Sequence, residues 1–178
     1  GLVGALGWDT LFDWEPKLRR EAPREIDIPD AVMCLATDMV AVDHKEGVVW
    51  LIANAVNANN SPEGVEAAYS AAVGRLNAMR AGLDRSLPLN AVEVREATQP
   101  EPRLRTAQED FENAVEAGKA AIRDGEVFQV VLSQRAEVEC SADPLDVYRV
   151  LRTINPSPYM YHLNLSDGAD GQFAVVGS

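Results

Sequence analysis

The spacing of apolar residues along the chain predicts short strands separated by turns. Apolar runs bounded by turn-forming residues predict strands at residues 1–8, 31–43, 48–53, 127–138, 159–165 and 173–176. The turn between the second and third runs predicts a hairpin, and the turn chemistry of residues 166–171 predicts another. Glycine recurs at every third position of the first run, and glycine inside a strand often marks the close approach of another backbone.

Three other stretches repeat apolar residues at steps of three and four, which predicts helices. A hydroxyl, a proline and an acid at residues 61–63 predict a helix start, and this helix is expected to run to about residue 81 with Gly82 as its stop. Residues 106–109 fit a capping box and predict a second helix, which Gly125 ends. Pro144 opens the third.

Strands that pair as hairpins, with helices between them, predict an α+β fold with largely antiparallel sheets and helices packed outside. Residues 84–105 carry three prolines and mixed charges, which predict a linker or excursion with a candidate edge strand at residues 91–96. Both ends of the chain fall inside predicted elements. The chain is therefore expected to be a piece of a longer protein with an incomplete fold.

The net charge of −12 makes nucleic acid and anionic lipid poor partners. No run of 18 apolar residues is present, so no membrane-spanning segment is expected, and the N-terminus lacks the pattern of a secretory signal. Cys34 and Cys140 are far apart in strand-like contexts, which indicates a reducing cytoplasm rather than a disulfide framework. His44 and His162 have no zinc-binding spacing.

Two prolines follow the third helix, in the segment Ile-Asn-Pro-Ser-Pro-Tyr-Met-Tyr at residues 154–161. Each proline biases the residue before it, Asn155 or Ser157, to extended geometry, so the backbone is stiff. A stiff segment that carries Tyr159 and Met160 could hold a small flat ligand at low ordering cost. From these residues alone, a proline-terminated helix that leads into a strand is the better explanation.

These motifs resemble anthranilate synthase component I, of the chorismate-utilising enzymes. The resemblance is most specific in Asp-Gly-Glu-Val-Phe-Gln-Val-Val-Leu-Ser-Gln-Arg (residues 124–135), in Asp-Pro at 143–144, and in residues 154–160. Residues 1–9 and 28–44 resemble the N-terminal domain of that family. The resemblance implies an N-terminal regulatory-type region at residues 1–83, the linker at 84–105, and the truncated start of the chorismate-binding catalytic fold at 106–178.

The resemblance also implies an activity. The family converts chorismate and glutamine-derived ammonia to anthranilate and pyruvate with Mg2+, together with a glutamine amidotransferase subunit (component II), and L-tryptophan inhibits it. The magnesium carboxylates and the catalytic histidine of the family match positions beyond Ser178. His162 is therefore given no catalytic role, and residues 1–178 alone are expected to be inactive.

Two sets of site residues follow from the resemblance. Pro158, Tyr159 and Met160 match the stretch that lines the tryptophan effector pocket, and Asn155 belongs to the same loop; the other wall is expected upstream of Gly1. A rigid extended backbone can offer N–H and C=O groups to an amino acid, while an aromatic ring and a thioether pack on an indole.

Gln129 stands where hydrating chorismate enzymes have a lysine general base. Glutamine cannot take a proton at neutral pH, but it can orient a nucleophile by hydrogen bonds. Because ammonia needs less activation than water, Gln129 favours an amino-transferring enzyme. Without the resemblance, a polar residue on the open face of a strand is the better explanation.

Three alternatives remain at this stage. One is aminodeoxychorismate synthase component I of the folate pathway, whose equivalent of residues 155–160 usually departs from this pattern. Another is a tryptophan-binding regulatory fragment without catalysis. The last is a structural role without a ligand.

Overall fold

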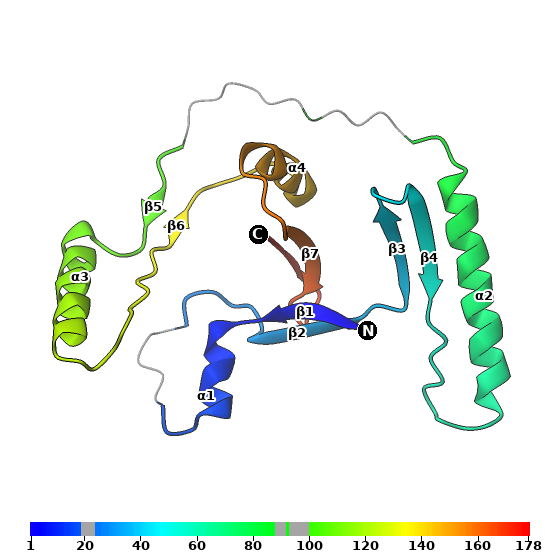
Figure 1. The fold of residues 1–178 in the computed structure, drawn as a ribbon, viewed down its shortest axis with the longest axis horizontal. Helices are drawn as coiled ribbons and strands as arrows, with labels where there is room; N and C mark the ends of the chain where they lie inside the picture. Colours follow the sequence, from blue (N-terminus) through cyan, green and yellow to red (C-terminus); the bar gives the residue numbers. More distant parts are fainter. Residues whose placement is uncertain (19–23, 88–91, 93–99) are drawn as a thin grey trace. The chain divides into compact units, whose positions relative to one another are not determined.

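The structure is a computed structural model that describes residues 1–18, 24–87, 92 and 100–178. Within these ranges the chain forms four two-stranded antiparallel sheets joined by helices and irregular segments (Figure 1). The predicted α+β class with largely antiparallel sheets is therefore confirmed.

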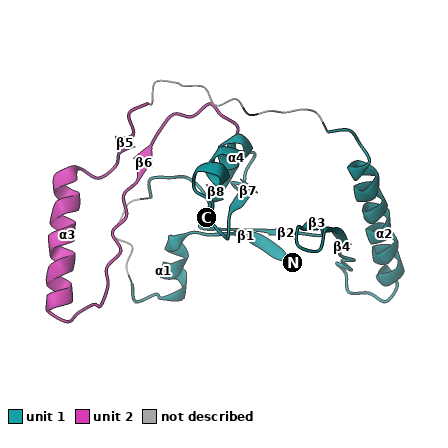
Figure 2. Ribbon diagram, turned by 45° about the horizontal axis from the view of Figure 1, so that its top comes forward, with its two compact units in different colours: residues 1–91, 144–178 teal, residues 92–143 magenta. Residues whose placement is uncertain are grey.

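Contacts divide the chain into two compact units (Figure 2). Unit 1 contains residues 1–91 and 144–178, and unit 2 contains residues 92–143. Of the predicted linker, residues 88–91 and 93–99 lie outside the described residues, and with them all of the predicted edge strand except residue 92. The assignment of the chain to regulatory, linking and catalytic parts stays a prediction.

The first sheet of unit 1 pairs β1 (Leu2–Leu6) with β2 (Ala31–Leu35). Its strands approach closely at Gly4. A Cβ added there would lie 2.8 Å from the Met33 Cα atom and closer still to the carbonyl oxygen of Val32, which belongs to the backbone and cannot swing aside. The close approach predicted from the repeated glycines is confirmed at this position.

Residues 31–43, predicted as one strand, form two, so that prediction is wrong. β2 pairs with β1, whereas β3 (Asp38–Asp43) belongs to the next sheet. The two strands are separated by Ala36 and Thr37. The carbonyl oxygens of these two residues accept hydrogen bonds from the side-chain amide of Asn54, at 3.4 and 3.2 Å. The apolar pattern continues across the break and gives no sign of it.

The predicted hairpin of β3 with β4 (Val48–Ala53) is confirmed. Its turn is held by Asp43, whose carboxylate accepts from the backbone N–H groups of Lys45 and Glu46 at 2.9 and 3.0 Å. Gly47 has a φ of +68°, which glycine adopts without strain.

The helix α2 (Gly64–Leu83) follows the hairpin and contacts β4. The Ser61 hydroxyl accepts from the N–H of Gly64 at 3.1 Å, but the N-cap is Glu63, so the helix begins two residues after the predicted first position, Pro62. Gly82, the predicted stop, lies inside the helix, which ends one residue later.

One arginine joins α2 to the base of the hairpin. Arg75 donates from Nε to the Asp38 carboxylate at 2.8 Å and from Nη2 to the Asn54 carbonyl oxygen at 2.8 Å. Because Asn54 also bridges the break between β2 and β3, this arginine connects the helix to both strand ends.

Unit 2 contains the predicted helix α3 (Gln108–Arg123). Its N-cap is Ala107, which has no side-chain acceptor, so the capping box predicted at residues 106–109 is wrong. Its end is as predicted: Gly125 has a φ of +78°, and the N–H of Glu126 donates back to the carbonyl oxygen of Ala121 at 3.0 Å.

The prediction of a strand at residues 127–138 is wrong except near the end of that range. Only β6 (Ala136–Glu137) is a strand, and it pairs with the unpredicted β5 (Arg103–Leu104). No backbone hydrogen bond in the described ranges involves residues 127–134. Phe128 is fully exposed and Val131 is 79% exposed. An apolar strand needs a hydrogen-bonded neighbour, and this segment has none within the described parts of the chain.

The C-terminal part of unit 1 contains α4 (Pro144–Ile154), β7 (Tyr161–Ser166) and β8 (Gln172–Gly177). The predicted helix and the predicted hairpin are both confirmed. α4 contacts both strands, and β7 also contacts β2. Leu165 on β7 and Ala72 on α2, each 4% exposed, are the buried apolar side chains of the described residues.

Candidate functional site

The connection between α4 and β7, residues 155–160, is the candidate effector site and is called the ledge below. The helix ends at Ile154, and the N–H of Asn155 donates to the carbonyl oxygen of Leu151 at 2.9 Å. The two prolines that follow have no N–H with which to continue the helix. The ledge therefore has neither helix nor strand structure, and the strand predicted to start at residue 159 starts at Tyr161 instead, so its predicted start is wrong.

The structure places the four predicted effector residues on this one connection. Asn155 and Pro158 are exposed, Tyr159 is 84% exposed, and Met160 is half-buried. An exposed ring beside a half-buried thioether gives an accessible apolar surface that requires no rearrangement of a packed core. Their role in binding an effector stays a prediction.

Two ring contacts flank the start of β7. The ring centroids of Tyr148 on α4 and His162 on β7 are 6.2 Å apart, with planes inclined by 43°. Tyr161 lies directly opposite Gly177, where an added Cβ would come within 2.7 Å of the Tyr161 hydroxyl oxygen. The tyrosine ring thus occupies the space that a side chain at Gly177 would need, an arrangement that stabilises glycine in strands.

Tyr148 was not predicted to form part of a site. It lies three residues before Leu151, so the two share a face of the helix, and both are half-buried, whereas Leu145 at the same spacing is 48% exposed. This spacing does not show which ring the tyrosine contacts.

Gln129, the predicted catalytic residue, lies in the irregular segment after α3 and is exposed. It belongs to unit 2, whereas the ledge belongs to unit 1, and each unit is described by itself. The predicted role of Gln129 in orienting a nucleophile stays a prediction.

Arg135, near the end of the same segment, forms part of a small charged cluster. It contacts the Glu137 carboxylate at 3.0 Å through Nη2, and Arg105 approaches the same oxygen at 3.5 Å through Nε. Two cations that share one carboxylate fix the end of β6.

Two surface pockets among the described residues are large enough to note. One of about 300 Å3 lies beside the short helices η1 (Trp8–Thr10) and α1 (Leu11–Trp14), with both tryptophans in its lining. One of about 460 Å3 lies in unit 2 beside β5 and β6, and carries three glutamates and Arg103. None of the predicted site residues lines either of them.

The described residues were also compared with the requirements of a metal site and of a membrane-spanning helix. No group of three or more histidine, cysteine or acidic side chains among the described residues is arranged to hold a metal ion. The described residues therefore do not fit a magnesium site. No helix in the described ranges is long and apolar enough to cross a membrane.

The family is decided by comparison with known proteins. The family model described as chorismate binding enzyme matches residues 1–177. The chain belongs to the chorismate binding enzyme family. The whole chain is 46% identical to anthranilate synthase component 1 of Arthrobacter globiformis and 45% identical to that of Mycolicibacterium smegmatis, and covers 34% of each.

A solved structure agrees with this assignment. The crystal structure of anthranilate synthase component I from Streptococcus pneumoniae TIGR4 matches 97% of this chain and 37% of its own, with a TM-score of 0.71 and 30% identity. The resemblance that the sequence motifs predicted is therefore confirmed. The chain spans about a third of the length of the curated relatives it matches.

Proposed function

We propose that this chorismate binding enzyme chain is part of an anthranilate synthase component I. The complete protein would convert chorismate and glutamine-derived ammonia to anthranilate and pyruvate in tryptophan biosynthesis. The observation that carries the proposal is the 46% identity, over the whole chain, to a protein with that name. The similarity in fold to a second such protein supports it.

Within this proposal the ledge is the effector surface. L-tryptophan would bind with its indole against Tyr159 and Met160, and the ledge backbone would hydrogen-bond its charged groups. The exposure of Tyr159 and the two prolines support this role, because the surface is accessible and costs little to order.

Gln129 would act in the catalytic part. Its amide oxygen can accept a hydrogen bond from ammonia, which orients the nitrogen lone pair toward the chorismate ring. In the complete protein, residues outside 1–178 would hold the magnesium ion that supplies positive charge for the carboxylates of the substrate. The amidotransferase subunit would supply the ammonia.

A chimera tests the proposal. Residues 1–178 would replace the matching third of the Arthrobacter globiformis protein, and anthranilate fluorescence would be followed with chorismate, ammonium and Mg2+. We expect turnover that L-tryptophan inhibits. A folded chimera that binds chorismate but forms no anthranilate would contradict the proposal.

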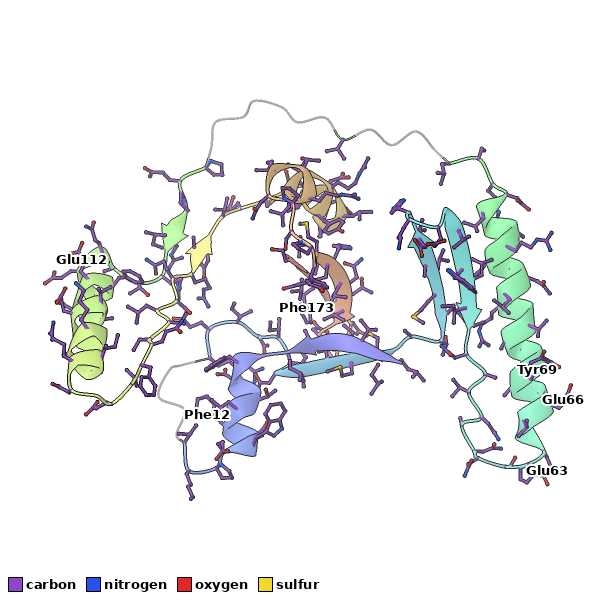
Figure 3. The ribbon with its side chains drawn as sticks, in the orientation of Figure 1. Phe12, Glu63, Glu66, Tyr69, Glu112 and Phe173 are labelled. Atoms are coloured by element: carbon purple, nitrogen blue, oxygen red, sulfur yellow. The ribbon has the colours of Figure 1, made fainter. Side chains whose placement is uncertain are left out.

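Two variants of the chimera separate the two sites. Tyr159→Ala should raise the tryptophan concentration needed for half-inhibition and leave the KM for chorismate unchanged, whereas Gln129→Ala should lower kcat with ammonium. Tyr69→Ala is the matched control, because this exposed tyrosine lies on α2 near Glu66 (Figure 3). Inhibition that survives Tyr159→Ala and Met160→Ala together would show that the ledge has only a structural role.

A further inference from the structure

Two exposed tryptophans line one pocket near the start of the chain. Trp8 in η1 is 81% exposed and Trp14 in α1 is 66% exposed, although tryptophan is highly buried on average in folded proteins. Both belong to the lining of the pocket of about 300 Å3, whose other lining residues are Leu6, Gly7, Thr10 and Leu11. Trp8 and Trp14 are called the tryptophan pair below. The pair presents two large aromatic side chains to a ligand at the surface.

The backbone around the pocket is held by its own hydrogen bonds. Thr10 is buried, and both its hydroxyl and its N–H donate to the carbonyl oxygen of Gly7, at 2.8 and 3.2 Å. The N–H of Gly7 donates in turn to the carbonyl oxygen of Asp30 at 2.6 Å, which ties the pocket to the residue before β2. A surface that is ordered before binding loses little conformational entropy when a ligand binds.

Carboxylates stand beside both indoles in the sequence. Asp9 directly follows the first tryptophan of the pair, while the exposed Asp13 and Glu15 stand on either side of the second. Over residues 6–30 the sequence carries seven acidic and four basic residues. The local charge is therefore negative, and it favours a cationic ligand over an anionic one.

An arginine side chain fits this combination of aromatic and acidic groups. Its guanidinium is planar, always charged, stacks on aromatic faces and pairs with carboxylates. Among aromatic side chains, tryptophan attracts a cation most strongly. Tryptophan and arginine are also the residue types, together with tyrosine, that contribute most at the centres of protein interfaces.

We propose that the tryptophan pair is a docking surface for an arginine-bearing segment of a partner protein. The guanidinium would lie against the indoles, and the carboxylates of Asp13 and Glu15 would balance its charge. This inference does not depend on the proposed function, because it uses only the pocket and its local charge.

Fluorine NMR of the 178-residue chain labelled with 5-fluorotryptophan tests the proposal. The chain contains three tryptophans, and single Trp→Phe variants assign their resonances. Tetra-arginine amide should shift the resonances of Trp8 and Trp14, and should leave that of Trp50 on β4 unchanged, although Trp50 is 61% exposed. Tetra-citrulline amide, which has nearly the same shape without the charge, should shift none of them. Equal shifts with both peptides, or equal shifts at all three tryptophans, would overturn the proposal.

Variants measure what the rings and the carboxylates contribute. Trp14→Ala should weaken the binding of tetra-arginine amide about 2-fold to 5-fold, as loss of one exposed cation–π contact requires, whereas the control Trp50→Ala should bind as the unchanged chain does. Asp13→Asn/Glu15→Gln keeps the shape of both side chains, and should weaken binding and reduce its sensitivity to salt. Unchanged affinity in either of the two pocket variants would contradict the proposal.

The chimera described above shows whether the tryptophan pair stays exposed in a complete protein. The fluorine resonances of Trp8 and Trp14 should shift between H2O and D2O, because solvent contacts both rings. An absence of these solvent shifts would show that the rest of the protein covers the pair, and this result would overturn the proposal.

Discussion

Replacement of Arg75 by alanine should loosen α2 and the β3–β4 hairpin together. The guanidinium bridges the helix to Asp38 at the start of β3 and to the Asn54 carbonyl just after β4, both at 2.8 Å. Alanine removes both bonds at once. It leaves the Asp38 carboxylate to be solvated by water.

The free energy lost in Arg75→Ala depends on how exposed the two charged side chains are. The Arg75 and Asp38 side chains are 36% and 34% exposed, so solvent screens the ion pair, which contributes about 0.5 kcal/mol. The bond from a charged donor to a backbone carbonyl contributes about 1.5 kcal/mol. Loss of about 2 kcal/mol should raise the equilibrium constant for opening about 30-fold, because 1.4 kcal/mol corresponds to a factor of ten.

Hydrogen exchange read by mass spectrometry measures this change peptide by peptide. In Arg75→Ala, peptides from α2 and β3–β4 should exchange about 30-fold faster, while peptides from α3 in unit 2 serve as the internal reference. Arg80→Ala, in the last turn of the same helix, is the matched control and should change exchange only slightly. Equal protection of α2 in Arg75→Ala and Arg80→Ala would refute the reasoning.

Three further outcomes are expected. Gly4→Val should separate β1 from β2, because the added Cβ would overlap the backbone of Val32 and Met33. NMR should then show the loss of the cross-strand contacts of β1, and a retained sheet would contradict the close approach. Gly125→Ala should cost about 1 kcal/mol, seen as faster exchange in the last turn of α3, because its φ of +78° disfavours a side chain; unchanged exchange would count against it. The 178-residue chain alone should form no fluorescent anthranilate from chorismate, ammonium and Mg2+, and turnover by a pure preparation would disprove this.

The local elements were largely predictable from the sequence. The β3–β4 and β7–β8 hairpins follow from apolar runs joined by turn residues, and α4 follows from a proline at its first position. Each of these signals acts within a few residues. The end of α4 before the ledge was predictable for the same reason, because a proline cannot continue a helix and restricts the residue before it.

The errors arise where structure depends on distant partners. The break after Leu35 is set by pairing with β1 and by the side chain of Asn54, neither of which appears in the apolar pattern. The irregular course of residues 127–134 reflects the lack of a neighbouring strand in the described structure. Contact between Tyr148 and His162 depends on how a helix packs on a hairpin, which spacing alone does not determine.

The segment after α3, which pairs with no strand in the described parts of the chain, has a practical consequence for handling the protein in solution. Residues 127–133 contain no charge and no proline, and their sequence is rich in valine, a composition typical of segments that assemble into intermolecular β-structure. The net charge of −12 opposes such association by mutual repulsion between molecules. Salt screens that repulsion, with a Debye length of about 3 Å at 1 M. Colloidal stability should therefore be greatest in dilute buffer, and salting-out steps should be avoided during purification.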